Sequence, residues 1–122
     1  MTTQAHVAFM TRAVREVGRI VTQNWGRTDA VTIEKKSRND YVTSVDQYIE
    51  KKLVTQIKRA YPDHRIVSEE VGALGNLESE WTWWIDPLDG TTNFIRSYPA
   101  VSISIALTHE GVSQCGVIYN PL

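Results

Sequence analysis

Residues 81–94 organise the chain and read Trp-Thr-Trp-Trp-Ile-Asp-Pro-Leu-Asp-Gly-Thr-Thr-Asn-Phe. The aromatic and β-branched first half favours a β-strand. Pro87 is expected to end that strand at Asp86, because a proline restricts the backbone conformation of the residue before it. Gly90 allows a close approach to the backbone, and Thr91 and Thr92 are typical of a helix start, where hydroxyl oxygens cap and backbone N–H groups face outward. The stretch therefore predicts a strand that leads into exposed amides.

Two acids stand where this strand is expected to end, Asp86 and Asp89, with the Leu88 carbonyl between them. Hard cations such as Mg²⁺ prefer carboxylate, carbonyl and water oxygens. Glu69 or Glu70, after a second strand candidate, could complete such a site. A Glu pair after a strand is usually solvated surface, and Asp-Pro commonly marks a turn. The joint run, with amides that suit a phosphate, nevertheless indicates a metal-assisted phosphate site.

Length and composition limit the possible functions. The 122 residues are close to the size of one domain, and a net charge of -1 argues against general nucleic-acid binding through a basic surface. The single cysteine, Cys115, excludes an internal disulfide and suits a reducing compartment. No apolar run is long enough to span a bilayer. We expect a cytoplasmic protein without a membrane partner.

Two helices are predicted before the central stretch, over residues 3–25 and about 43–61. In both, apolar residues recur at spacings of three and four, which gives one apolar stripe along each helix. Thr2 or Thr3 can cap the first helix. In the second, Thr43 followed by Asp46 resembles a capping box.

Short strands are predicted at residues 31–35 and 65–67, and a loop at residues 72–80. Residues 100–107 alternate between apolar and small or polar side chains, which predicts a strand with one apolar face. Residues 112–119 are expected to pair back on it as a hairpin. The order predicts an α+β or layered α/β fold with carboxylates at strand ends.

The run from Trp84 to Phe94 closely resembles the signature of the inositol monophosphatase family, Mg²⁺-dependent and lithium-sensitive phosphomonoesterases. The resemblance extends to Lys36, to residues 40–47 (Asp-Tyr-Val-Thr-Ser-Val-Asp-Gln) and to residues 66–70 (Ile-Val-Ser-Glu-Glu). It implies the N-terminal portion of an αβαβα sandwich, the fold of fructose-bisphosphatase-like sugar phosphatases. Residues 1–122 would be the N-terminal part of one phosphatase domain. The missing C-terminal part would carry a further metal ligand and most inositol-recognising residues.

The resemblance also implies a role for each matching residue. The catalytic pair that positions and activates the nucleophilic water would be Glu69 and Thr91. The metal ligands would be Glu69, Asp86, the Leu88 carbonyl and Asp89. Substrate would be bound by Glu69, Leu88, Asp89, Gly90, Thr91 and Thr92. A surrounding shell would comprise Lys36, Asp46 and Glu70.

The implied activity is hydrolysis of inositol monophosphate to inositol and phosphate with two or three Mg²⁺ ions, inhibited by Li⁺. The implied assembly is a homodimer. Two alternatives stay open. One is a phosphatase for a related sugar phosphate or a 3′-phosphoadenosine nucleotide. The other is a non-catalytic regulator that contacts RNA polymerase or a transcription factor, as some bacterial relatives do.

Overall fold

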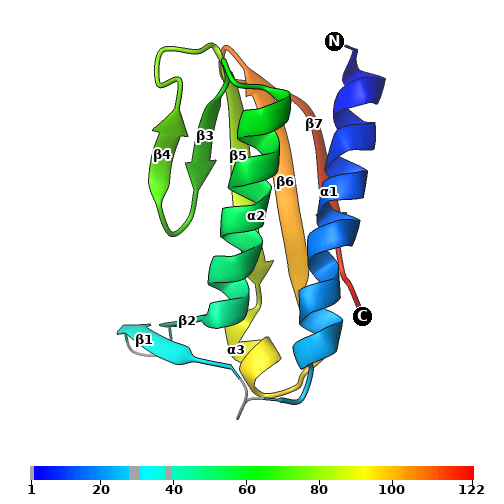
Figure 1. Cartoon of the computed structure of the whole chain (residues 1–122), viewed down its shortest axis with the longest axis vertical. Helices are drawn as coiled ribbons and strands as arrows, with labels where there is room; N and C mark the ends of the chain where they lie inside the picture. Colours follow the sequence, from blue (N-terminus) through cyan, green and yellow to red (C-terminus); the bar gives the residue numbers. More distant parts are fainter. Residues whose placement is uncertain (1, 28–30, 38–39) are drawn as a thin grey trace.

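A computed structural model describes residues 2–27, 31–37 and 40–122, and it places two helices against one face of a mixed sheet (Figure 1). The sheet has the strand order β4-β3-β5-β6-β7, in which β3 and β5 are parallel and the other neighbours antiparallel. A separate antiparallel pair is formed by β1 and β2. The elements are α1 (Thr3–Asn24), β1 (Ile33–Ser37), β2 (Asp40–Thr43), α2 (Ser44–Ala60), β3 (Arg65–Ser68), β4 (Gly72–Gly75), β5 (Trp81–Asp89), α3 (Thr91–Ile95), β6 (Ser102–His109) and β7 (Val112–Tyr119).

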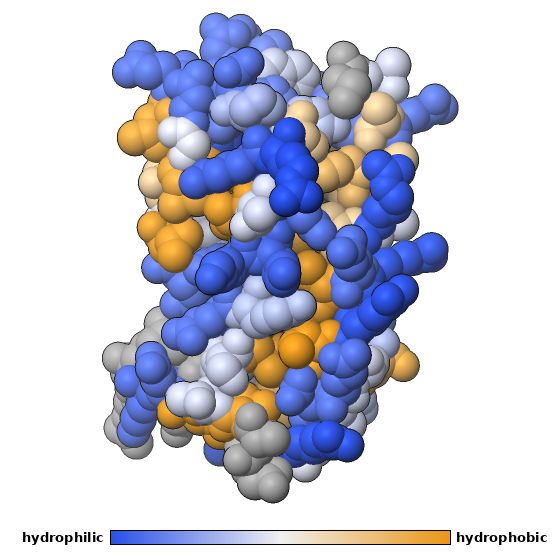
Figure 2. Space-filling model, viewed as in Figure 1, coloured by the Kyte–Doolittle hydropathy of each residue, from blue (hydrophilic) through white to orange (hydrophobic). Residues whose placement is uncertain are grey.

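Both long helices form where the apolar spacing predicts them. Thr2 caps α1, accepting a hydrogen bond from the Ala5 N–H at 3.2 Å. Thr43 caps α2 in a capping box with Asp46, which confirms that prediction. The helices lie side by side over the sheet, and Figure 2 shows hydrophilic side chains covering most of their outer surface. The apolar stripes therefore face the sheet and form one half of the core.

The other half of the core comes from alternate residues of the central strands. Ile103, Ile105 and Leu107 of β6 are buried, as the predicted alternation requires. Trp83 of β5 is fully buried beside them, whereas the next residue, Trp84, is 44% exposed. Successive side chains of a strand point to opposite faces, so Trp83 points toward the helices and Trp84 points away from them. The apolar core therefore lies between the helices and one face of the sheet.

Several predicted boundaries are wrong. Pro87 does not end the strand, because the pairing of β5 with β6 shifts register between Asp86 and Asp89, where a missing N–H does not interrupt the ladder. The predicted loop at 72–80 contains β4, whose glycines pair back on β3. The strand predicted at 31–35 lies instead at Ile33–Ser37.

The sheet face opposite the helices carries an apolar hollow of about 730 Å³. Trp84, Ala106 and Ile118 line it, and Glu69 and Asp86 also belong to its wall. Ile118 is 79% exposed. No helix in the described ranges is both long and apolar enough to cross a membrane.

Candidate metal and phosphate site

The parallel pairing of β3 with β5 brings two distant carboxylates together. Ser68 pairs with Ile85, and the Glu69 N–H donates to the Ile85 carbonyl at 3.4 Å. Glu69 directly follows the last residue of β3, and Asp86 directly follows the residue of β5 that pairs with it. The two acids lie side by side at one edge of the sheet, although 16 residues of chain lie between them.

A polar cavity of about 250 Å³ opens at this edge, beside α3. Of the predicted site residues whose side chains are described, all line this cavity except Asp46, and Asn93 lines it in addition. The lining residues are Glu69, Glu70, Asp86, Leu88, Asp89, Gly90, Thr91, Thr92 and Asn93. Lys36 lies in β1, and its side chain falls outside the described part of the chain. The structure thus brings the predicted acids and the predicted phosphate-binding backbone into one cavity.

Asp86 lines this cavity and has a strongly raised pKa. Burial, then contact with the Glu69 carboxyl, then repulsion by Glu69, Asp89 and Asp46 raise the pKa of Asp86 to about 7. Within the described residues, its Oδ1 atom is buried without a hydrogen-bond partner. A buried carboxylate oxygen among like charges is costly unless a cation pairs with it. This all-oxygen group of donors fits a hard divalent cation such as Mg²⁺.

The Thr91 hydroxyl is hydrogen-bonded to the carboxylate of Asp46. The Thr91 hydroxyl lies 2.7 Å from Asp46 Oδ2 and 3.2 Å from the Leu88 carbonyl oxygen. No hydrogen bond joins Thr91 to Glu69 among the residues that the structure describes. Asp46 does not line the cavity, but it contacts a hydroxyl that does, and its place in a surrounding shell stays a prediction.

Asp46 is held by the same contacts that start helix α2. Its carboxylate accepts the Thr43 N–H at 3.0 Å and a short hydrogen bond from the Thr43 hydroxyl. Asp46 is 3% exposed, and this burial raises its pKa, although the hydrogen bonds from Thr43 and Thr91 oppose the rise. A fixed carboxylate with a raised pKa can accept a proton through Thr91.

Gly90 joins β5 to α3 in a left-handed conformation, with φ +88°. It is the N-cap of α3, without a side-chain cap, so Thr91 and Thr92 lie inside the helix and do not cap it as predicted. A Cβ at position 90 would lie 2.5 Å from the Ala100 carbonyl oxygen. The Asn93 side chain donates to the same oxygen at 2.8 Å. The cavity wall can therefore form only with glycine at this position.

Gly90→Ala is expected to lower the free energy of unfolding by at least about 2 kcal/mol, because left-handed strain and a backbone clash add together. Urea unfolding measures this change. Gly111→Ala is the matched control: Gly111 has φ +80°, but a Cβ at this position would have no atom within 4 Å, so the variant reports the conformational strain alone. Equal losses in the two variants would contradict the proposed clash at Gly90.

Glu50 is a buried acid beside the site that the sequence reasoning missed. It is 5% exposed on α2 and accepts the Ser68 hydroxyl at 2.5 Å and the Glu70 N–H at 3.2 Å. Its spacing from Asp46 was the available signal, since residues four apart share a helix face. That face could not be assigned to the site without knowing which strand ends beside α2.

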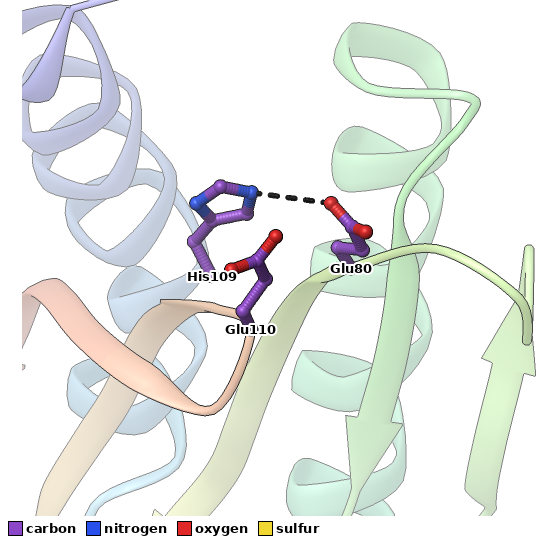
Figure 3. A group of neighbouring side chains, drawn as sticks. All are labelled: Glu80, His109 and Glu110. Carbon is purple, nitrogen blue, oxygen red and sulfur yellow. Dashed lines mark ion pairs between the residues drawn. The ribbon is translucent and has the colours of Figure 1, made fainter.

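A second group of titratable side chains lies at the opposite end of β5 and β6. Glu80, His109 and Glu110 point toward one another there (Figure 3), with potential ligand atoms within 4.8 Å. His109 Nε2 lies 3.5 Å from Glu80 Oε2, and its ring stacks on Trp81 with centroids 4.1 Å apart. Both glutamates are exposed. These contacts fasten the β6–β7 turn, far from the carboxylates at the other end of β5.

Comparison with known proteins identifies the class of protein to which this site belongs. The model of the inositol monophosphatase family matches residues 3–122. The chain belongs to the inositol monophosphatase family, which confirms the resemblance carried by residues 84–94.

Individual relatives carry two kinds of name. "Nus factor SuhB" of Pasteurella multocida is 43% identical over 111 residues, which are 91% of this chain and 42% of that protein. The crystal structure of the suppressor protein SuhB from Bartonella henselae matches with a TM-score of 0.91 at 33% identity, over 96% of this chain and 45% of that one. An IMPase of Thermotoga maritima matches with a TM-score of 0.85 at 33% identity, over 96% and 44%.

These likenesses confirm the layered α/β fold. The chain spans about two fifths of the length of the curated relatives that it matches. The family membership supports a phosphatase site with a bound metal, and the chain alone represents less than half of the relatives' structure.

Proposed function

We propose that the protein carrying this chain is a Mg²⁺-dependent phosphomonoesterase that hydrolyses inositol monophosphate to inositol and phosphate. The observation that carries the proposal is the buried, unpartnered Asp86 oxygen in a cavity lined by acids and by the Gly90–Thr91 backbone. Carboxylates that repel one another need cations, and the amides beside them need an anion. A metal-bound phosphate ester supplies both.

Mg²⁺ would be held by Glu69, Asp86, the Leu88 carbonyl and Asp89. When bound, it polarises a phosphoryl group, makes a water more acidic and neutralises developing charge. The backbone of Gly90, Thr91 and Thr92 orients the phosphate at the start of α3.

Proton transfer is the task of Thr91 and Asp46. Because the Thr91 hydroxyl donates to Asp46, its oxygen keeps lone pairs that can accept a hydrogen bond from the attacking water. As that water attacks phosphorus, Thr91 takes its proton and passes its own to Asp46. Glu69 lies beside Asp86 in the same cavity and helps to orient the same water.

The test is phosphate release from inositol 1-phosphate by the protein carrying this chain, measured against Mg²⁺ concentration. We expect saturable, Mg²⁺-dependent release that chelation abolishes and that Li⁺ inhibits in the millimolar range. Fructose 1,6-bisphosphate and a 3′-phosphoadenosine nucleotide complete the panel and test the related activities. Release that is absent for all three substrates would refute the proposal.

A regulatory function is the second candidate. It is favoured by the relatives named "Nus factor SuhB", which are 40–44% identical over about nine tenths of this chain. Such a role would require contact with the transcription machinery through a protein surface. Asp86→Asn separates the two functions, because it should remove hydrolysis and spare a purely regulatory phenotype. The homodimer that the resemblance implies and the cytoplasmic location that the composition indicates also stay predictions.

A further inference from the structure

We propose that Glu50 is a positioning residue that fixes the metal-binding carboxylate of Glu69 from behind the cavity wall. This inference rests on the proposed function. Glu50 does not line the cavity. Its carboxylate instead accepts hydrogen bonds from Ser68 and Glu70, the residues on either side of Glu69.

The contacts leave little freedom to the segment that carries Glu69. One oxygen of Glu50 accepts both the Ser68 hydroxyl and the Glu70 N–H, at 2.5 and 3.2 Å. The Glu69 N–H is itself bonded to Ile85 on β5. Three consecutive residues are thus fixed, two to helix α2 and one to the strand that carries Asp86.

A carboxylate at position 50 is difficult to explain by stability alone. Glu50 is 5% exposed, and no ion pair to it is found among the described residues. Burying an acid without a cation partner is costly, whereas hydrogen bonds that orient metal ligands are needed for affinity. We infer that the carboxylate of Glu50 serves the geometry of the Ser68–Glu70 segment.

Helix α2 then organises both sides of the cavity. Asp46 lies one turn before Glu50 on the same face and holds Thr91. One helix therefore sets the distance between the proton-accepting pair and the metal-binding carboxylate.

The experiment compares Glu50→Ala and Glu50→Gln in the protein carrying this chain. Glu50→Ala removes the acceptor and is expected to raise the Mg²⁺ concentration for half-maximal activity about 10- to 100-fold, the usual effect of removing an orienting partner. It should also speed hydrogen exchange at the Glu70 amide. Glu50→Gln keeps an acceptor oxygen in place, so we expect it to restore the Mg²⁺ dependence to within about threefold of the parent.

Two controls separate positioning from general destabilisation. Glu78→Ala removes an exposed glutamate and should change nothing. Leu53→Val loosens the core of the same helix and should lower stability without shifting the Mg²⁺ dependence. An unchanged Mg²⁺ dependence in folded Glu50→Ala, an equal shift in Leu53→Val, or failure of Glu50→Gln to restore it would each overturn the proposal.

Two further measurements keep the proposal testable. If Glu50→Ala does not fold, Ser68→Ala removes one of the two contacts and should give a smaller shift in the same direction; no shift would count against the proposal. If the parent hydrolyses no phosphate ester, the proposed function fails. Calorimetric Mg²⁺ titration and exchange at the Glu70 amide then decide the role of Glu50 separately.

Discussion

Asp86→Asn is expected to lower Mg²⁺-dependent phosphate release by at least about a thousandfold. A bound cation contributes several kcal/mol of charge stabilisation in the transition state, and each 1.36 kcal/mol corresponds to a factor of ten in rate. Asp86 is the acid that faces Glu69 and is also near Asp89 and Asp46. An amide in its place removes the negative charge at the centre of the group. Phosphate release at saturating Mg²⁺ measures the loss.

The same substitution should stabilise the metal-free protein at about pH 8. The pKa of Asp86 is about 7 in the folded chain and 3.8 ordinarily. Between these values the unfolded chain has lost the proton that the folded chain keeps, so stability falls as pH rises toward about 7. Asparagine carries no such proton. We expect a gain on the order of 2 kcal/mol at about pH 8, after allowance for solvent screening, and little gain at about pH 4.

Urea unfolding in the presence of a chelator measures this gain at both pH values. Glu78→Gln, at an exposed glutamate, is the matched control and should alter neither activity nor the pH dependence of stability. A variant at position 86 that loses stability at high pH would show that the carboxylates do not repel one another in the folded protein.

The sequence predicts most elements of the fold because their signals are local. The apolar stripe and Thr43 capping box locate α2 to within one or two residues. Alternation in β6 identifies its buried face, and Glu110-Gly111, both with positive φ, form the predicted turn into β7. Pro87 misled the prediction because its effect on the ladder depends on where the partner strand shifts register.

The residues of the site could be predicted from their motif, but their pairings could not. Thr91 is 45 residues from Asp46, and Glu50 is 18 residues from Ser68. No periodic spacing and no capping motif in the sequence links the two residues of either pair. Each contact exists because α2 packs across the ends of β3 and β5, which depends on burial over the whole sheet. The contact of Thr91 with Asp46 could therefore not be predicted, and the joint role of Glu69 and Thr91 in activating the water stays a prediction.

Thr91→Val is expected to lower the rate of hydrolysis about 10²- to 10⁴-fold, the range for loss of a positioned acid–base group. Valine has nearly the shape of threonine, but it cannot take a proton from water or donate to Asp46. Asp46→Asn removes the acceptor at the other end of the same 2.7 Å contact and should cost a similar factor. Turnover at saturating Mg²⁺ and substrate measures both losses. Thr55→Val, at an exposed threonine of α2, is the matched control and should keep full activity.

The double variant decides whether the two residues act as a unit. If protons pass from water through Thr91 to Asp46, removing both should cost little more than removing either, because each single substitution already breaks the path. Independent roles would instead give losses that multiply. Multiplying losses would separate the two residues and return the proton-accepting role to Glu69, whose carboxylate lines the same cavity. The 2.7 Å contact would then serve only to hold α3 against α2.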